Sequence, residues 1–294
     1  MTTHRMAPDG DLDLEEIGHA ATHKLPQVTL LYWVIKIAAT TLGETGGDMF
    51  SQTLKLGYFL STVALVGVFL VSLVAQLRAS QYHPAFYWAV ILTTSMAGTT
   101  ISDFMNRDAS TQYLAAGTSS LGWGPQGLGI GYPVGAAILS SLLVVVFAVW
   151  RATGHPFSIA RISSFRAELL FWTAILISNT LGTSLGDFLS DSSGLGYAGG
   201  AALVATLIAV IAGLYLVRSV PNTLLFWAAF VLTRPLGATV GDYVTKPTVK
   251  GGLGLGTYGA SALLALVMVG GVAWVTLQHR REQRLAGATV PVPA

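Results

Sequence analysis

The chain has 294 residues, of which 52% are hydrophobic and 10% are charged, and its net charge is +2. A soluble domain carries about 25% charged residues, so this chain has too little polar surface to cover itself in water, and its mean hydropathy of +0.62 predicts a membrane protein. The small net charge argues against nucleic-acid binding, and the absence of Cys excludes disulfides, thiolate metal sites and cysteine catalysis.

A polar stretch, residues 1–28, holds five acidic residues and lacks the apolar core of a signal peptide, so we expect a cytoplasmic tail there. Eight apolar runs follow, each long enough to cross a bilayer as a helix. They lie at roughly 29–48, 56–77, 85–104, 131–151, 168–188, 197–217, 223–243 and 256–277. We therefore expect an all-α membrane protein, with eight transmembrane helices over residues 29–278 and a second polar cytoplasmic tail over 279–294.

A four-fold repeat organises these runs. Four Trp residues each begin the same pattern: a Gly ten residues later, a hydroxyl residue twelve residues later and an Asp fifteen residues later. The Trp residues are Trp33, Trp88, Trp172 and Trp227, and the repeated cores are GETGGDM, GTTISDF, GTSLGDF and GATVGDY. Four copies at one spacing predict four tandem units of two helices each, at about 29–78, 84–151, 167–218 and 222–278. Each unit forms a hairpin, and because it crosses the membrane twice, all four units are expected in parallel orientation.

The basic residues predict the orientation of these units. Ten Lys and Arg residues fall on the side of the Trp residues and four on the side of the Asp residues. Because positively charged loops remain in the cytoplasm, we expect both termini in the cytoplasm and the Asp residues toward the outside. The Trp residues are expected to anchor the helices at the membrane interface. The glycine-rich loop from Arg107 to Ile130 departs from the repeat and is either an outer cap or a tolerated insertion.

The four repeated Asp residues are the main candidates for chemistry, as a ring or as pairs. They are Asp48, Asp103, Asp187 and Asp242, and Glu44 adds a fifth carboxylate one turn before Asp48. Neutral oxygens are expected from the hydroxyls that follow each Trp by twelve residues, Thr45, Thr100, Ser184 and Thr239. Charged groups inside membrane spans often mark ion or proton paths, and carboxylate and hydroxyl oxygens suit hard divalent cations.

Two basic residues, Lys36 and Arg234, lie well inside apolar runs and are expected to act as counter-ions for the acids. Pro235 follows Arg234 and is expected to break or kink its helix. Arg107 and Asp191 are expected at the solvated rim. Each repeated Asp has an alternative structural role, because an Asp at a helix end can cap the next helix.

The repeat resembles a bacterial family of uncharacterised membrane-anchored proteins that is defined by a four-fold repeat of unknown function. The resemblance covers about residues 30–278 and rests on the Trp-to-Gly-x-hydroxyl-x-x-Asp core. It implies eight spans and a location in the bacterial inner (plasma) membrane, and it implies no activity. GETGGD is also faintly similar to the signature of calcium–manganese cation/proton exchangers, from which it departs by one inserted residue.

We expect a membrane transporter, a proton-coupled exporter or exchanger of a small divalent metal cation, with Glu44 and Asp48 as candidate metal ligands. One alternative is a membrane scaffold or sensor without transport. Another is a transporter of an organic metabolite, in which Lys36 and Arg234 pair with a substrate carboxylate. Nucleotide and zincin motifs are absent and no nucleophile–base pair stands out, so neither an enzyme nor a bound cofactor is expected. The expected partners are the lipid bilayer, the cation and protons.

Overall fold

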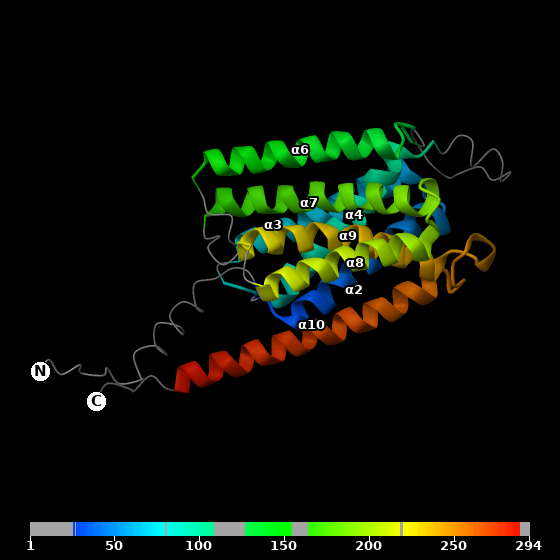
Figure 1. Ribbon diagram of the computed structural model, residues 1–294. Coiled ribbons are helices and arrows are strands. Elements are labelled where there is room, and N and C mark those ends of the chain that lie inside the picture. The colour runs from blue at the N-terminus through cyan, green and yellow to red at the C-terminus, as the bar shows by residue number, and fades with distance from the viewer. Residues whose placement is uncertain are drawn as a thin grey trace, which may run out of the picture.

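Figure 1 shows a computed structural model of the chain, which describes residues 26, 28–79, 81–108, 127–154, 164–217 and 220–288. Every regular element in these ranges is helical. The expected N-terminal tail and most of the loop after Arg107 lie outside the described residues. Six of the described helices are long and apolar enough to cross a membrane, which agrees with the composition.

The first helix of each repeat belongs to an inner bundle. These helices are α2 (Leu30–Asp48), α4 (Pro84–Asn106), α7 (Phe165–Asp187) and α9 (Asn222–Thr245). Each packs against two others in the order α2, α4, α7, α9, and α9 packs in turn against α2. The four repeats therefore close into a ring, in which the fourth repeat contacts the first.

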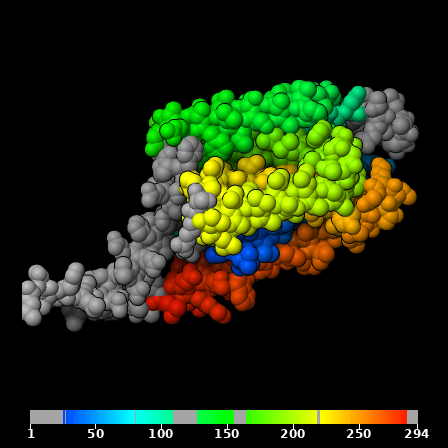
Figure 2. Space-filling model, viewed as in Figure 1, coloured from blue at the N-terminus to red at the C-terminus, as the bar shows by residue number. Residues whose placement is uncertain are grey.

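The second helix of each repeat lies outside this bundle. The outer helices are α3 (Tyr58–Arg78), α6 (Tyr132–Ala152), α8 (Gly196–Val217) and α10 (Gly256–Ala288). In Figure 1 α6 and α10 lie at opposite edges of the molecule, and in Figure 2 α6, α8 and α10 cover most of the visible face. Their apolar side chains point largely outward, including Val71 on α3 and Val144 on α6.

The outer helices connect neighbouring repeats, a pairing that differs from the expected hairpins. Gly135 of α6 lies against Asn106 of its own repeat, and Gly200 of α8 lies against Leu189 of its own repeat. From there α3 packs on α4, α6 on α7, α8 on α9, and α10 returns to α2. Each outer helix thus packs mainly on the inner helix of the next repeat.

The repeated Gly explains how the inner helices approach one another. A Cβ added at Gly43 would overlap Ser95 Cβ, and one at Gly237 would lie 2.7 Å from Thr40 Oγ1. Equivalent contacts join Gly98 to Asn179 and Gly182 to Arg234. In every repeat the Gly ten residues after Trp meets the residue seven after Trp in the next repeat. The spacing conserved within the chain therefore marks one contact used four times around the ring.

Two helices differ from their expected course. α10 runs to Ala288, ten residues beyond the expected end of the membrane domain at 278. Its last turns carry exposed Arg280, Arg281 and Arg284, which favour helix and extend past the apolar part. α9 is a continuous helix through Pro235, so the expected break does not occur.

Replacing Gly43 with Ala is expected to destabilise the protein. The added methyl group overlaps Ser95, and overpacking typically costs about 1–3 kcal/mol, which exceeds the roughly 0.5–1 kcal/mol by which Ala favours helix over Gly. Thermal unfolding of the detergent-purified variant should show a lower midpoint. Gly213→Ala on α8 is the matched control, because its Cβ would meet open space, and its midpoint should be unchanged or higher. An unchanged midpoint for Gly43→Ala would contradict the close contact between α2 and α4.

Candidate functional site

The Trp-bearing ends of the inner helices meet in an aromatic cluster. Trp88, Trp172 and Trp227 are buried, and their rings contact those of neighbouring helices, as when Tyr87 lies 5.7 Å from Trp172 between ring centroids. The Tyr32 and Tyr87 hydroxyls are 3.0 Å apart within it. Most of the repeated Trp residues therefore fill the bundle interior instead of anchoring it at the membrane interface, which corrects the role expected from sequence.

Arg234 lies where the inner helices meet. Its Nη1 donates to the Thr40 carbonyl at 2.7 Å, its Nη2 to the Ser95 carbonyl at 3.0 Å, and its Nε to the Asn179 carbonyl at 3.2 Å. Thr40, Ser95 and Asn179 are the residues equivalent to Arg234 in the other three repeats, seven positions after each Trp. The fully buried guanidinium therefore lies on the axis of the ring and bonds to all of the other repeats.

Glu44 faces Arg234 one turn farther along the axis. Its Oε2 lies 3.2 Å from Arg234 Nη2, and it accepts from the Thr99 hydroxyl at 3.2 Å and the Thr183 hydroxyl at 3.4 Å. Thr99 and Thr183 are equivalent to Glu44 in the second and third repeats. Arg234 Nη2 also donates to the hydroxyls of both Thr residues. Arg234 therefore forms an ion pair with one of the predicted acids, Glu44.

Lys36 occupies a different place. Its side chain is fully buried on α2, and its ammonium lies 3.9 Å from the centroid of the Phe230 ring. Within the described part of the chain its Nζ has no hydrogen-bond partner. A cation over an aromatic face is stabilised by the ring quadrupole, so Lys36 is held by an aromatic contact and not by one of the predicted acids.

The four repeated Asp residues gather at the other end as two pairs. Arg107 bridges one pair, with Nε 2.7 Å from Asp103 Oδ1 and Nη2 2.9 Å from Asp187 Oδ2. Lys246 bridges the other pair, with Nζ 2.7 Å from Asp48 Oδ2 and 3.1 Å from Asp242 Oδ1. All four carboxylates are buried. The sequence predicted a ring or pairs, and the structure has pairs.

The neighbouring acids favour the charged form of both bridging groups. Burial alone would lower the pKa of Lys246, but Asp48 and Asp242 raise it well above its usual range. Burial likewise opposes the charge of Arg107, whereas Asp103 and Asp187 raise its pKa. These ion pairs engage the carboxylates that were predicted to cap helices. The Asp carboxylates accept from basic side chains, and Asp48 accepts in addition from Gln52 Nε2 at 2.6 Å.

The hydroxyls predicted as neutral ligands point elsewhere. Thr100 and Thr239 donate to carbonyls of their own helices, Thr45 accepts from Ser261, and Ser184 pairs with Ser102 and Asn106. Thr99 and Thr183 are the residues whose hydroxyls reach the Glu44 carboxylate. Each comes one position before a predicted residue, Thr100 or Ser184. Helix geometry explains the difference, since residues four apart share a face whereas the next residue is rotated by about 100°.

Arg107 and Lys246 are the functional candidates that sequence reasoning misplaced or missed. Arg107 was expected at the solvated rim, and Lys246 was counted only for topology. Both follow the Asp of their own repeat by four residues, in DFMNR and DYVTK. That spacing places an acid and a base side by side on a helix, so the sequence contained the signal. Asp191 is exposed, as expected, and lies 3.7 Å from Arg107.

One group of acids has the geometry to hold a cation. Glu44, Asp48 and Asp242 each offer a carboxylate oxygen, and these oxygens lie within 4.8 Å of one another. Asp242 Oδ2 is buried and has no hydrogen-bond partner among the described residues. Carboxylate oxygens are the ligands that Ca²⁺, Mg²⁺ and Mn²⁺ prefer, and in this structure the Lys246 ammonium lies against two of these three acids.

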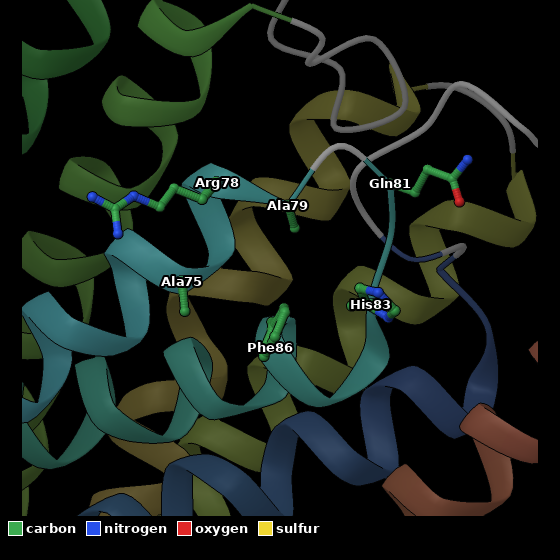
Figure 3. A pocket seen from close by; sticks show the side chains of 6 residues that line it. All are labelled: Ala75, Arg78, Ala79, Gln81, His83 and Phe86. Carbon is green, nitrogen blue, oxygen red and sulfur yellow. The ribbon is translucent and has the colours of Figure 1, made fainter.

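A surface pocket lies at the opposite end of the bundle from the Asp pairs. It has a volume of about 320 Å³ and is formed by the end of α3, the following turn and the start of α4 (Figure 3). Its lining residues are Ala75, Arg78, Ala79, Gln81, His83 and Phe86. None of the axial charged residues contributes to this pocket.

Repeated helices, apolar outer faces and an interior of buried charges define an all-helical protein whose helices suit a membrane. A family model described as a Repeat of Unknown Function (DUF347) matches the chain four times, at residues 31–82, 86–155, 170–220 and 225–282. The chain therefore belongs to this family, and the four matches confirm the predicted four-fold repeat. No curated protein and no solved structure matches the chain.

Replacing Arg234 with Gln is expected to lower stability strongly. Removing one partner of a buried ion pair leaves the other charge uncompensated and typically costs about 3–5 kcal/mol. The thermal unfolding midpoint of the purified variant measures this loss. The double variant Arg234→Gln with Glu44→Gln should regain part of it, because the unpaired carboxylate is gone. A double variant that loses the sum of both single effects would show that Arg234 and Glu44 do not stabilise one another.

Proposed function

We propose that the protein is a secondary transporter that exchanges a small divalent cation for protons. The proposal rests on one observation above all: five buried carboxylates from all four repeats converge on one axis. They are Glu44, Asp48, Asp103, Asp187 and Asp242. Buried charges are costly inside a membrane protein and commonly mark ion pathways. Replacing buried ion pairs with well-packed apolar side chains is often neutral or stabilising, so a purely structural core would not need these charges.

The balance of charge supports a divalent cation. Five buried carboxylates contact three basic groups, those of Arg107, Arg234 and Lys246. Asp191, which lies 3.7 Å from Arg107, is exposed and is left out of this count. Lys36 contributes to none of these ion pairs, because its ammonium lies over Phe230. Two carboxylate charges are therefore left over, and either one divalent cation or two protons would neutralise them. Exchange of one divalent cation for two protons would keep the buried charge constant.

The entry of the cation would take place at Glu44, Asp48 and Asp242. Their oxygens are close enough to share one ion, and Lys246, whose side chain is 18% exposed, would shift off the shared position as the ion arrives while its charge stays beside the acids. A Lys ammonium is a point charge on a flexible stem, so it can shift without breaking a fixed geometry. Onward movement would require Glu44 to part from Arg234 and the aromatic cluster to open.

The membrane arrangement forms part of the proposal. We infer that all eight long helices span the membrane, with the four repeats in parallel orientation. α2 and α4 carry the buried polar residues of the axis and are covered by outer helices, so they can cross without being strongly apolar. The exposed Arg residues at the Trp end of the described chain support a cytoplasmic location for that end and for both termini. They are Arg78, Arg151, Arg166, Arg280, Arg281 and Arg284.

A second candidate is transport of a small organic anion. Lys36 favours it, because its buried ammonium has no hydrogen-bond partner in the described residues and could pair with a substrate carboxylate. The position of Lys36 beside the aromatic cluster, away from the exposed end of the axis, weighs against it. A flux panel that includes organic acids separates the two candidates.

The double variant Glu44→Gln with Asp48→Asn is expected to abolish cation flux. Both changes remove ligand charge while keeping the shape of the side chains, and Glu44 and Asp48 are two of the three shared ligands. Flux of Mn²⁺, Ca²⁺ and Mg²⁺ into proteoliposomes under an imposed pH gradient measures the effect, together with the accompanying proton movement. The matched control is Glu282→Gln, an exposed acid near the end of α10, which should transport like the unmodified protein.

Absence of flux for every divalent cation in the unmodified, correctly folded protein would overturn the proposal. Flux of an organic acid instead, lost in Lys36→Met, would establish the second candidate. Persistence of divalent cation flux in the double variant would remove Glu44 and Asp48 from the pathway.

A further inference from the structure

The four-fold repeat is also a two-fold repeat. After Asp48 and Asp187, in the first and third repeats, the chain continues as π-helical turns η1 (Met49–Thr53) and η3 (Phe188–Ser192). After Asp103 and Asp242, in the second and fourth repeats, the helix ends within four residues at Arg107 and Lys246. The odd repeats therefore match one another, and so do the even repeats.

The two Asp pairs follow this two-fold relation. In each pair a basic residue from an even repeat bridges the Asp of its own repeat, four positions earlier, and the Asp of an odd repeat. Arg107 does so between α4 and α7, and Lys246 does so between α9 and α2. The residues that follow the odd-repeat Asp by four positions also lie close by, with Gln52 on Asp48 and Asp191 near Arg107. The bundle thus holds two versions of one arrangement.

The two bridging groups hold their carboxylates differently. Arg107 uses two separate nitrogens of one planar group, Nε for Asp103 and Nη2 for Asp187. Lys246 uses a single nitrogen for both Asp48 and Asp242. The guanidinium fork fixes the geometry of two carboxylates and stays charged, whereas the ammonium is a flexible point charge. The two groups therefore differ in rigidity, since the planar fork restricts Arg107 and the flexible stem leaves Lys246 free to shift.

Carboxylate oxygens remain free in both arrangements. Asp103 Oδ2, Asp187 Oδ1 and Asp242 Oδ2 are buried and have no hydrogen-bond partner among the described residues. A buried carboxylate oxygen without a partner is costly. The pair around Arg107 therefore has two oxygens without a partner and two that Arg107 binds. A hard cation could use all four oxygens of two such carboxylates.

We propose that Asp103 and Asp187 form a second divalent-cation site, which the guanidinium of Arg107 occupies permanently as a built-in cation. This inference rests on the proposed function for the Asp48–Asp242 half, where Lys246 is the displaceable equivalent. One half then exchanges its ion with solution, and the other half has a fixed charge. Arg107 determines how many ions the protein binds, and removing it opens the second site.

Equilibrium binding of Mn²⁺ to the detergent-purified full chain tests this inference, with free Mn²⁺ measured by electron paramagnetic resonance. The unmodified protein should bind one Mn²⁺ per chain, and Arg107→Gln should bind two. Arg107→Lys retains the charge and recreates the arrangement of the other half. It should therefore fold even if Arg107→Gln fails to fold, and it should also bind two. Lys246→Arg should lose the ion bound by the unmodified protein. Arg107→Gln with Asp187→Asn should return to one.

The outcomes separate this inference from the proposed function. One Mn²⁺ in the unmodified protein and still one in folded Arg107→Gln and Arg107→Lys would overturn the second site and leave the proposed function standing. No Mn²⁺ in the unmodified protein but one in Arg107→Gln would support the second site and contradict the proposed ligands at Asp48 and Asp242. No Mn²⁺ in any folded variant would overturn both.

Discussion

The guanidinium of Arg234 is the contact on which the arrangement of the repeats depends. It donates to the backbone carbonyl of the equivalent residue in each of the other three repeats and forms an ion pair with Glu44. A single side chain can reach all three neighbours only if the four inner helices surround one axis at close range. The repeated Gly makes that approach possible, and Gly182 itself lies against the Arg234 stem. The fourth repeat carries a large side chain at this position and the other three carry smaller ones. Four large side chains would not fit together at the axis.

This ring has a polar interior and an apolar exterior. Its axis carries ion pairs and hydroxyls, and its outer helices expose rows of Val and Leu side chains, as expected where lipid replaces water as the surrounding medium. The buried ions are therefore kept away from the apolar surroundings by a second layer of protein. The aromatic cluster fills one end of the axis, and the Asp pairs lie near the exposed ends of α4 and α9. Charge is thus concentrated at one end of the axis, and bulky aromatic rings fill the other end.

Much of this could be predicted from the spacing of a few residues, and the rest depended on contacts between repeats. Trp and Asp at a constant separation predicted four units and the gathering of Asp48, Asp103, Asp187 and Asp242. The hydroxyl in the same motif was misleading, because a position shared by all repeats can serve helix packing, as Thr45 does with Ser261. Thr99 and Thr183 could have been chosen, since they lie four residues before an Asp and therefore on its face. The partner of each outer helix could not be predicted, because the sequence of one repeat is compatible with packing on its own inner helix or on the next one.

Closure of the ring between the first and last repeats is the claim that every other conclusion needs. The hydroxyls of Thr45 on α2 and Ser261 on α10 are 2.8 Å apart, and the chain has no native Cys. Thr45→Cys with Ser261→Cys, oxidised in the membrane, should therefore form a disulfide within one chain, detected by loss of both free thiols and faster migration on a non-reducing gel. The control pair, Thr45→Cys with Ser141→Cys on the outer face of α6, should keep its thiols. A folded Thr45–Ser261 Cys variant that keeps both thiols free, or one that links only between chains, would contradict the closed ring.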